Sequence, residues 1–339
     1  MAEGRNALQA GKDVFGKAVG KETDKRMQII SGTVDFELQG ASAVAIGKFD
    51  GMHRGHKALL EEILRAKKEG LLAAVFTFEP SPAAFFSGKT VKGLTTKEEK
   101  RRMLRQLGID VLVEFPLNEK TAAMPPEEFI RDILCRNMKA AFIAAGTDLS
   151  YGDQGKGDYR LLESLSGAHG YRVKIIEKVQ EGGAEISSTR VRDCVEEGRM
   201  EEASQLLGEP YAVMGTVVHG NQIGRTIGFP TVNLTPPADK LLPPKGVYRS
   251  EVECCRGIFR GLTNVGTKPT VEQGQNPPMG VETYLYGFDG DIYDTFITVR
   301  LESFVRPERK FSGLSELQEQ LKKDIVACAG SLKRPPFEA

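Results

Sequence analysis

The first half of the chain alternates between strand-like and helix-like patterns of apolar residues. Runs of small and β-branched residues are typical of buried strands. The strands predicted in this way span 42–47, 72–78, 111–115, 140–145 and 172–177. Between them, apolar residues recur at helical spacing and predict helices at 57–68, 97–107, 126–138 and 158–166. Strands and helices in alternation predict an α/β fold, with a parallel sheet covered by helices on both faces.

The pattern changes from about residue 211. The strands predicted beyond this point are short, several alternate apolar with polar residues, and turn residues separate them. They span 211–218, 247–254, 258–264, 281–286 and 296–304. A closing helix is expected at 315–328, where Leu317, Leu321 and Ile325 recur every fourth residue. This half therefore predicts a small antiparallel barrel or sandwich, an all-β fold.

Two domains follow from this change of pattern, and a length of 339 residues fits two domains of ~100–200 residues each. We assign 27–207 to the first domain and 208–339 to the second. Residues 1–26 are polar and contain several lysines. They lack the apolar centre of a signal peptide, so we expect a disordered extension there.

Charge and cysteine content narrow the functional classes. Lys+Arg and Asp+Glu both number 46, whereas nucleic-acid-binding proteins are usually basic. The five cysteines are scattered without a C-x-x-C pair, which argues against a disulfide framework or a zinc site and favours the cytoplasm. No run approaches the ~20 apolar residues of a membrane helix. We therefore expect neither a nucleic-acid nor a membrane partner.

The loop after the first buried strand is the strongest candidate for chemistry. It contains His53 and His56, half of the four histidines in the protein, at the start of a predicted helix. Free N–H groups at a helix start attract phosphate, and two imidazoles can both donate to phosphate oxygens. Gly51 and Gly55 would let the backbone approach a ligand. Structural histidines in a turn are the alternative, and a zinc site is disfavoured because no further ligand follows nearby.

A second polar segment opens the last helix of this half. The hydroxyls of Ser187, Ser188 and Thr189 can cap the helix and form a polar nest for phosphate. Arg192 supplies a planar positive group that suits a triphosphate. The alternative is an ordinary N-cap followed by a surface arginine.

The segment 47–56 resembles the H-x-G-H nucleotidyltransferases, and its longer form resembles the adenylyltransferase half of bacterial bifunctional riboflavin kinase/FAD synthetase. Further segments that resemble this family lie at 77–82, 94–96, 146–152 and 186–192. The resemblance implies that FMN attacks ATP, with His53, His56 and Arg192 at the phosphates. It also implies ATP contacts at Gly47, Phe49, Asp50, Gly55, Ser187, Ser188 and Thr189, and a flavin contact at Asp148.

A glycine-punctuated loop at 215–234 is the second candidate. Turns need glycine as well, so the glycines alone decide little. However, Thr231 and Asn233 alternate with Val232, and in an extended segment both side chains fall on one face. A hydroxyl and an amide oxygen side by side suit Mg²⁺ carried by ATP.

This loop resembles the riboflavin kinase signature, whose P-T-x-N core matches 230–233. Other segments that resemble the family are 244–248, 264–270, 281–283 and 306–311. The resemblance makes Glu282 the base for the riboflavin 5′-hydroxyl, where a solvent-facing strand glutamate is the alternative, and it gives Arg306 a flavin contact. It implies ATP contacts at Gly220, Gly224, Arg225, Gly228, Pro230, Thr231 and Asn233, and metal contacts at Thr231 and Asn233.

The resemblance covers residues 27–328 and implies a Rossmann-like nucleotidyltransferase domain, then a six-stranded antiparallel Greek-key β-barrel with a C-terminal helix. It implies a cytoplasmic enzyme, a monomer or weak homo-oligomer, that phosphorylates riboflavin to FMN with ATP and Mg²⁺. The enzyme would then adenylylate FMN to FAD and release pyrophosphate. The alternatives are a chain with one activity, a flavin- or nucleotide-binding regulator, and a nucleotidyltransferase for another acceptor.

Overall fold

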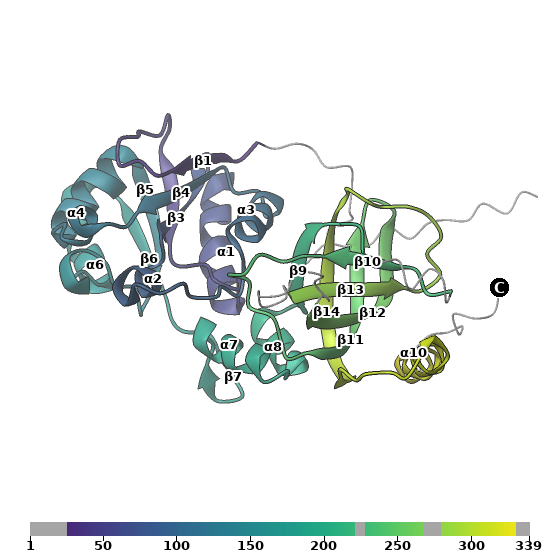
Figure 1. Cartoon of the computed structure of the whole chain (residues 1–339). Coiled ribbons are helices and arrows are strands. Elements are labelled where there is room, and N and C mark those ends of the chain that lie inside the picture. Colours follow the sequence, from purple (N-terminus) through teal and green to yellow (C-terminus); the bar gives the residue numbers. More distant parts are fainter. Residues whose placement is uncertain (1–25, 221–227, 268–278, 330–339) are drawn as a thin grey trace, which may run out of the picture.

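The computed structural model describes residues 26–220, 228–267 and 279–329. Within these ranges the chain forms two six-stranded sheets that lie side by side, and a small two-stranded hairpin (Figure 1). Nearly all of the expected N-terminal extension lies outside the described residues, as do Gly224 and Arg225 of the predicted kinase site. In the described ranges, no helix is long and apolar enough to cross a membrane.

The first sheet is parallel throughout, in the order β1-β4-β3-β2-β5-β6. Its strands are β1 Gln28–Ser31, β2 Ser42–Ile46, β3 Leu72–Glu79, β4 Val111–Pro116, β5 Ala140–Gly146 and β6 Arg172–Ile176. The five predicted strands are confirmed, and the strand pattern that opens at Met27 forms β1 at the edge. The strand order reverses between β2 and β5. Open α/β sheets bind their ligands at the carboxyl ends of the strands beside such a reversal.

Helices cover both faces of this sheet (Figure 1). They are α1 Arg54–Lys68, α2 Pro82–Ser87, α3 Lys97–Gln106, α4 Glu119–Ala122, α5 Pro126–Glu128, η1 Phe129–Asn137, η2 Asp153–Gly155 and α6 Tyr159–His169. Successive residues of β2 point to opposite faces. Val44 packs in one core cluster with Ile130 of η1, whereas Ala45 packs in another with Ile63 of α1. The helix predicted at 126–138 is confirmed as α5 followed by π-helical turns.

A hairpin and two helices connect the first sheet to the second. They are β7 Gln180–Glu181, β8 Ala184–Glu185, α7 Ser188–Glu196 and α8 Met200–Leu207. Val191 of α7 and Leu206 of α8 share a core cluster with residues of the second sheet, such as Val299. The two helices therefore pack on the barrel as well as joining it to the first half.

The second sheet is antiparallel, in the order β10-β13-β12-β11-β14-β9. Its strands are β9 Tyr211–Thr216, β10 Thr231–Leu234, β11 Gly246–Cys254, β12 Gly257–Thr267, β13 Met279–Leu285 and β14 Phe296–Pro307. Strands β11 to β13 form a meander, and β10 and β14 flank it, which is a Greek-key order. An isolated bridge between Val218 and Asn233 brings the two edges together. The five predicted strands are confirmed, and β10 is added.

The predicted closing helix is confirmed as α10 Leu314–Ala329. It packs on the outside of the barrel, where Ile325 is buried with Phe229, Val247 and Leu262.

Candidate active sites

The two histidines of the first candidate site lie where β2 turns into α1, beside the reversal in strand order. His53 is the N-cap of α1, and its Nδ1 accepts a hydrogen bond from the backbone N–H of His56 at 3.3 Å. The two rings stack with their centroids 3.7 Å apart. Both imidazoles therefore lie at the start of a 15-residue helix, where N–H groups and the helix dipole favour an anion.

The loop before α1 packs tightly around these rings. A Cβ at Gly55 would lie 3.2 Å from the His53 ring, and a Cβ at Gly47 would lie 3.2 Å from the Phe49 ring. Phe49 is fully buried, and its ring centroid lies 5.1 Å from that of His56. The Phe49 side chain therefore supports the His56 imidazole from the interior, and the two glycines leave room for this packing.

Burial makes both imidazoles weak bases. It lowers the pKa of His53 to about 4, although the charges of Asp148 and Asp50 act in the opposite direction. Burial also lowers the pKa of His56 well below its usual range, and the neighbouring His53 and Lys100 lower it further. Both rings are therefore neutral at pH 7, and a neutral imidazole can donate one N–H to a phosphate oxygen.

Asp50 joins the two predicted motifs of this half. The Nη2 of Arg192 donates to the Asp50 carboxylate at 3.1 Å, and its Nη1 donates to the carbonyl of Lys92. The hydroxyl of Ser188 donates to the Asp50 carbonyl at 3.0 Å. A guanidinium has five N–H donors, so these two bonds leave donors for a ligand. The fold thus brings the histidine loop and the start of α7 together, as the sequence predicted.

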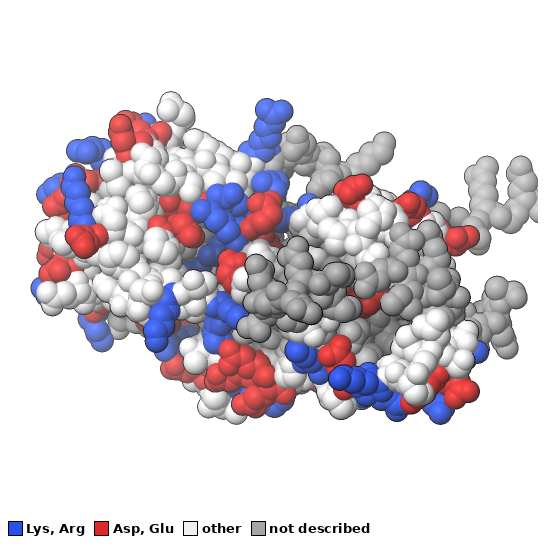
Figure 2. Space-filling view, viewed as in Figure 1, with Lys and Arg blue, Asp and Glu red and all other residues white. Residues whose placement is uncertain are grey.

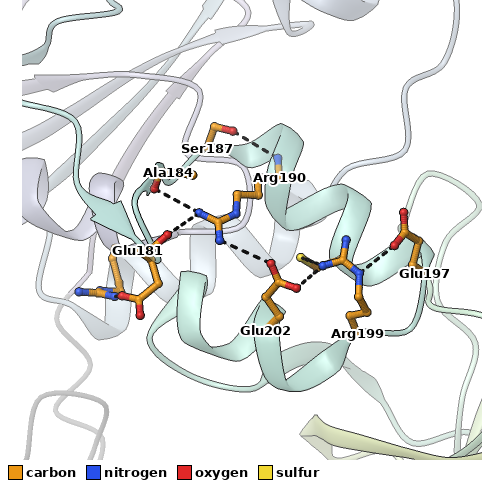
Figure 3. Close-up of polar contacts among 9 residues, drawn as sticks. Glu181, Ala184, Ser187, Arg190, Glu197, Arg199 and Glu202 are labelled. Atoms are coloured by element: carbon orange, nitrogen blue, oxygen red, sulfur yellow. Dashed lines mark hydrogen bonds and ion pairs between the residues drawn. The ribbon is translucent and has the colours of Figure 1, made fainter.

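The start of α7 is held in place by Arg190, which the sequence analysis did not select. Ser187 caps the helix by accepting a hydrogen bond from the Arg190 N–H at 3.2 Å. The Arg190 guanidinium donates to the carbonyls of Glu181 and Ala184 on the hairpin and pairs with Glu202 on α8 (Figure 3). This arginine fixes the helix start against its neighbours, whereas Arg192 reaches the histidine loop.

Two other predicted residues lie at the rim of the site. Thr189 and Asp148 are both exposed. Asp148 follows β5, the strand on the other side of the order reversal, and its charge acts on His53. A Cβ at Gly146 would lie 2.8 Å from the Asp148 carboxylate. The structure therefore places Asp148 near the imidazoles, and its flavin contact stays a prediction.

The second candidate site lies on the barrel, where β10 pairs with β13. Asn233 lies opposite Glu282 in this pairing, and the hydroxyl of Thr231 donates to the Glu282 carboxylate at 2.6 Å. Val232, between the two predicted metal ligands, packs in the barrel core. Thr231 and Asn233 therefore share one face of their strand, as predicted, and that face also holds Glu282.

A cavity of about 220 Å³ opens beside this face. Gly220, Pro230, Thr231 and Asn233 line it, together with the loop 288–293. A Cβ at Gly220 would lie only 2.5 Å from the Asn233 Nδ2, so glycine is required for the backbone to pass this amide. The remaining described glycine of the predicted set, Gly228, is exposed and has a φ of +80°.

The oxygen donors on this face fit Mg²⁺. Thr231 offers a hydroxyl, Asn233 an amide oxygen and Glu282 a carboxylate, and Mg²⁺ combines a few such ligands with waters and phosphate oxygens. In the part of the chain that the structure describes, no group of three or more His, Cys, Asp or Glu side chains could hold a metal ion. The few oxygen donors on this face leave coordination positions for waters and for the phosphate oxygens of a nucleotide.

Comparisons with known proteins divide the chain in the same way. The FAD synthetase family model matches residues 35–190, and the riboflavin kinase family model matches residues 207–332. Bifunctional riboflavin kinase/FMN adenylyltransferase of Bacillus subtilis is 36% identical over 292 residues, which are 85% of this chain and 92% of the relative. The protein of the same name from Escherichia coli is also 36% identical, over 84% of this chain and 91% of its own. The chain belongs to the bifunctional riboflavin kinase/FMN adenylyltransferase family.

A solved structure supports the two-domain fold of this family member along nearly its whole length. A crystal structure described as a macrolide-efflux protein from Streptococcus pneumoniae is 30% identical and superposes with a TM-score of 0.77. The match covers 90% of this chain and 99% of the neighbour. That description belongs to the neighbour, and the match bears on the fold.

Arg306, the flavin contact that the family resemblance implied, lies against the closing helix of the riboflavin kinase half. Its Nε and Nη2 pair with the Asp324 carboxylate at 2.9 Å and 2.8 Å. The other oxygen of Asp324 accepts a hydrogen bond from Gln320 at 2.7 Å. The side chain of Asp324 is only 4% exposed. The structure thus shows Arg306 docking α10 onto the barrel.

The adenylyltransferase half holds a second cation, besides Arg190, that the sequence analysis did not select. The ammonium of Lys100, on α3, donates to the carbonyl of Lys48 in the histidine loop at 2.9 Å, and burial lowers its pKa. Figure 2 shows basic side chains gathered over α3, where the two halves meet. Because α3 carries several basic residues in a row, its sequence pattern could not distinguish Lys100 from its neighbours.

The kinase half holds a further feature that the motifs did not indicate. The loop 288–293 lines the cavity beside Thr231, and its Tyr293 stacks on His219 with ring centroids 3.9 Å apart. The only sequence signal was a cluster of Gly and Asp residues between two strands, which is typical of any turn.

Proposed function

We propose that this chain phosphorylates riboflavin to FMN in its barrel half and adenylylates FMN to FAD in its N-terminal half. The observation that carries the proposal is the match of one chain to both family models, each spanning one of the two clusters of site residues. ATP serves both reactions, with ADP leaving in the first and pyrophosphate in the second. The product of the first reaction is the substrate of the second.

In the N-terminal half the reaction joins two anions. A phosphate oxygen of FMN attacks the α-phosphorus of ATP, so the nucleophile is already charged and needs no strong base. The barrier falls by positioning and by opposing the phosphate charge. His53 and His56 donate neutral N–H groups to the phosphates, and Arg192 adds a fixed positive charge that Asp50 orients. The hydroxyls of residues 187–189 complete the cradle.

In the barrel half the nucleophile is a neutral alcohol, which gives a carboxylate a clear task. Glu282 accepts the proton of the riboflavin 5′-hydroxyl as its oxygen attacks the γ-phosphorus of ATP. The hydrogen bond from Thr231 keeps this carboxylate in one orientation. Thr231 and Asn233 would hold Mg²⁺, which neutralises phosphate charge when it is bound with ATP.

We also propose the domain boundaries, the cellular location and the partners of the enzyme. We assign residues 27–207 to the adenylyltransferase domain and 208–339 to the kinase domain. We place the protein in the cytoplasm as a monomer or weak homo-oligomer, with ATP and flavins as its partners and with neither nucleic acid nor membrane. The equal numbers of acidic and basic residues and the five free cysteines support this setting.

Product analysis tests the two activities separately. Wild type incubated with riboflavin, ATP and Mg²⁺ is expected to form FMN and then FAD. His53→Ala should stop at FMN, and Glu282→Ala should form FAD only when FMN is supplied. His169→Ala and Glu251→Ala remove the same side chains elsewhere and should keep both activities.

The other outcomes identify the alternatives. A wild type that forms only FMN has one activity. A wild type that binds flavin tightly but releases neither ADP nor pyrophosphate is a binding protein, and the proposed function is then wrong.

A further inference from the structure

Residues 92–96, which precede α3, lie between the barrel and the adenylyltransferase site. We call them the linking segment. On the barrel side, the backbone N–H of Gly93 donates to the carbonyl of Asp239 at 2.7 Å, and the N–H of Leu241 donates to the carbonyl of Gly93 at 2.8 Å. The linking segment is therefore attached to the kinase half through its backbone.

Between those two barrel residues, Lys240 sends a buried ammonium into the same contact. Its side chain is 0% exposed. The Nζ donates to the carbonyls of Leu94 at 2.7 Å and Ala212 at 2.8 Å, and to the Glu99 carboxylate at 2.8 Å. An ammonium has three donors, and each has an acceptor here. The three acceptors come from the linking segment, from β9 and from α3.

The partners of Lys240 are tied together in turn. The Glu99 carboxylate accepts the N–H of Thr96 at 2.8 Å, which caps α3, and the N–H of Met214 on β9 at 2.8 Å. The hydroxyl of Tyr211 lies 2.9 Å from the Leu94 carbonyl. One buried polar network thus joins the barrel to the linking segment and to the first turn of α3.

On its other side the linking segment contacts the residues proposed for adenylyl transfer. The N–H of Thr95 donates to the Asp50 carboxylate at 3.0 Å, and the N–H of Gly51 donates to the Thr95 hydroxyl at 3.3 Å. The carbonyl of Lys92 accepts a hydrogen bond from Arg192. Asp50 and Arg192 therefore take their positions partly from the linking segment.

We propose that Lys240, a residue of the kinase half, is a positioning residue for adenylyl transfer, because it holds the linking segment that orients Asp50 and Arg192. The proposal rests on the proposed function of the N-terminal site. It gives the ion pair between Lys240 of the kinase half and Glu99 of the N-terminal half a role in adenylyl transfer through the linking segment.

Such an ion pair fixes the relative arrangement of the segments it joins more than it stabilises the fold. Burying two charges is costly, and well-packed apolar side chains in their place often stabilise a protein equally well or better. An ammonium with three acceptors from three segments, in contrast, is satisfied in one arrangement of those segments only. Apolar contact would let the linking segment shift, and Asp50 would shift with it.

The first test replaces Lys240 by methionine, which keeps a long unbranched side chain and removes the ammonium. Adenylylation of supplied FMN and phosphorylation of riboflavin are measured separately. For adenylylation, kcat/KM for ATP should fall about 10- to 100-fold, because a displacement of ~1 Å far from the chemistry can cost about a hundredfold. Phosphorylation should keep its wild-type kcat and KM, although Lys240 belongs to the kinase half.

Lys240→Met leaves the Glu99 charge buried without its partner. If this prevents folding, two further variants still test the proposal. The double variant Lys240→Met/Glu99→Gln removes both charges. Tyr211→Phe removes one hydroxyl beside the Leu94 carbonyl and should lower adenylylation in the same direction but less. Arg300→Met is the matched control, because it removes a barrel cation whose carboxylate partners lie on β11, and it should leave both activities unchanged.

Two results would overturn the proposal. One is wild-type adenylylation in the folded variants. The other is an equal loss of both activities, which is what a general loss of stability produces. A wild type without adenylylation would instead refute the proposed function of the N-terminal site, and the first measurement of the series shows it.

Discussion

The adenylyltransferase site and the kinase site differ in how far they are organised before a ligand arrives. In the first, His53 and His56 are buried and stacked, and Asp50 already pairs with Arg192. In the second, Glu282 is exposed on the outer face of the barrel, beside an open cavity.

This difference follows the chemistry of the two nucleophiles. A phosphate that attacks another phosphate needs its charge opposed, and fixed donors in a dry site do this best. An alcohol needs a proton acceptor, and a carboxylate can accept a proton only if the alcohol can reach it. In each variant, the reaction of the unchanged site can therefore serve as an internal control for the changed one.

The largest effect is expected for Glu282→Gln. Glutamine keeps the size of the side chain and can accept the hydrogen bond from Thr231, but it cannot take the proton of the alcohol. Phosphorylation of riboflavin should fall about 10²- to 10⁴-fold, the usual contribution of a general base. Adenylylation of supplied FMN should not change. Glu251→Gln on β11 is the control, because it makes the same change elsewhere in the barrel. A Glu282→Gln variant that still phosphorylates riboflavin at the wild-type rate would show that Glu282 is not the base.

The next largest effect is expected for His56→Asn, which tests the adenylyltransferase site. It removes a neutral donor from the phosphate cradle, and losing one preorganised donor costs about 10²- to 10³-fold in rate. Adenylylation should fall by about this factor, whereas phosphorylation should not change. His169→Asn serves as the control. Equal effects on the two reactions would mean that His56 supports the fold rather than the reaction.

A smaller effect is expected where a glycine contacts a proposed metal ligand. In Gly220→Ala the added Cβ meets the Asn233 amide at 2.5 Å, so the amide must move. Such overpacking costs ~1–3 kcal/mol. If this cost falls on ATP binding, kcat/KM for phosphorylation should fall about 5- to 150-fold, and adenylylation should not change. Gly167→Ala, where nothing lies within 4 Å of the new Cβ, should leave both rates unchanged.

The smallest effect concerns stability and pH. The pKa of His53 is about 4 in the folded chain and 6.5 without the fold, so the unfolded chain binds the proton first as the pH falls. The contribution of the neutral ring is complete above pH 6.5 and is lost between pH 6.5 and 4. In urea unfolding, wild type should lose stability in this range more steeply than His53→Asn, by up to ~1.4 kcal/mol per pH unit. Parallel curves for the two proteins would contradict the buried, neutral state of His53.

Much of both sites was predictable from the sequence because their central residues are close along the chain. His53 and His56 lie three residues apart at a helix start, and Thr231 and Asn233 alternate on one strand. For such pairs, the local period of a helix or strand settles which side chains share a face. The same periods predicted the two sheets and the helix that closes the barrel.

The misses have a common cause. The ion pair of Arg306 with Asp324 was not predicted, because Asp324 comes from a helix whose docking no local pattern describes. The flavin contact of Arg306 stays a prediction. Arg190 and Lys100 stood among other basic residues, and only their contacts in the fold distinguish them. Residues 231–233 were treated as extended, but β10 was not predicted as a strand of the sheet, because its pairing with β13 is a long-range contact.

The sequence by itself determined which elements form, in what order, and which residues of each element face the interior, because burial within an element follows its own period. Only the tertiary structure decided which distant groups meet. Lys240 and Glu99 are 141 residues apart, and their contact depends on how the barrel docks beside α3. No spacing along the chain encodes that docking, because it results from the shapes and charges of two whole surfaces.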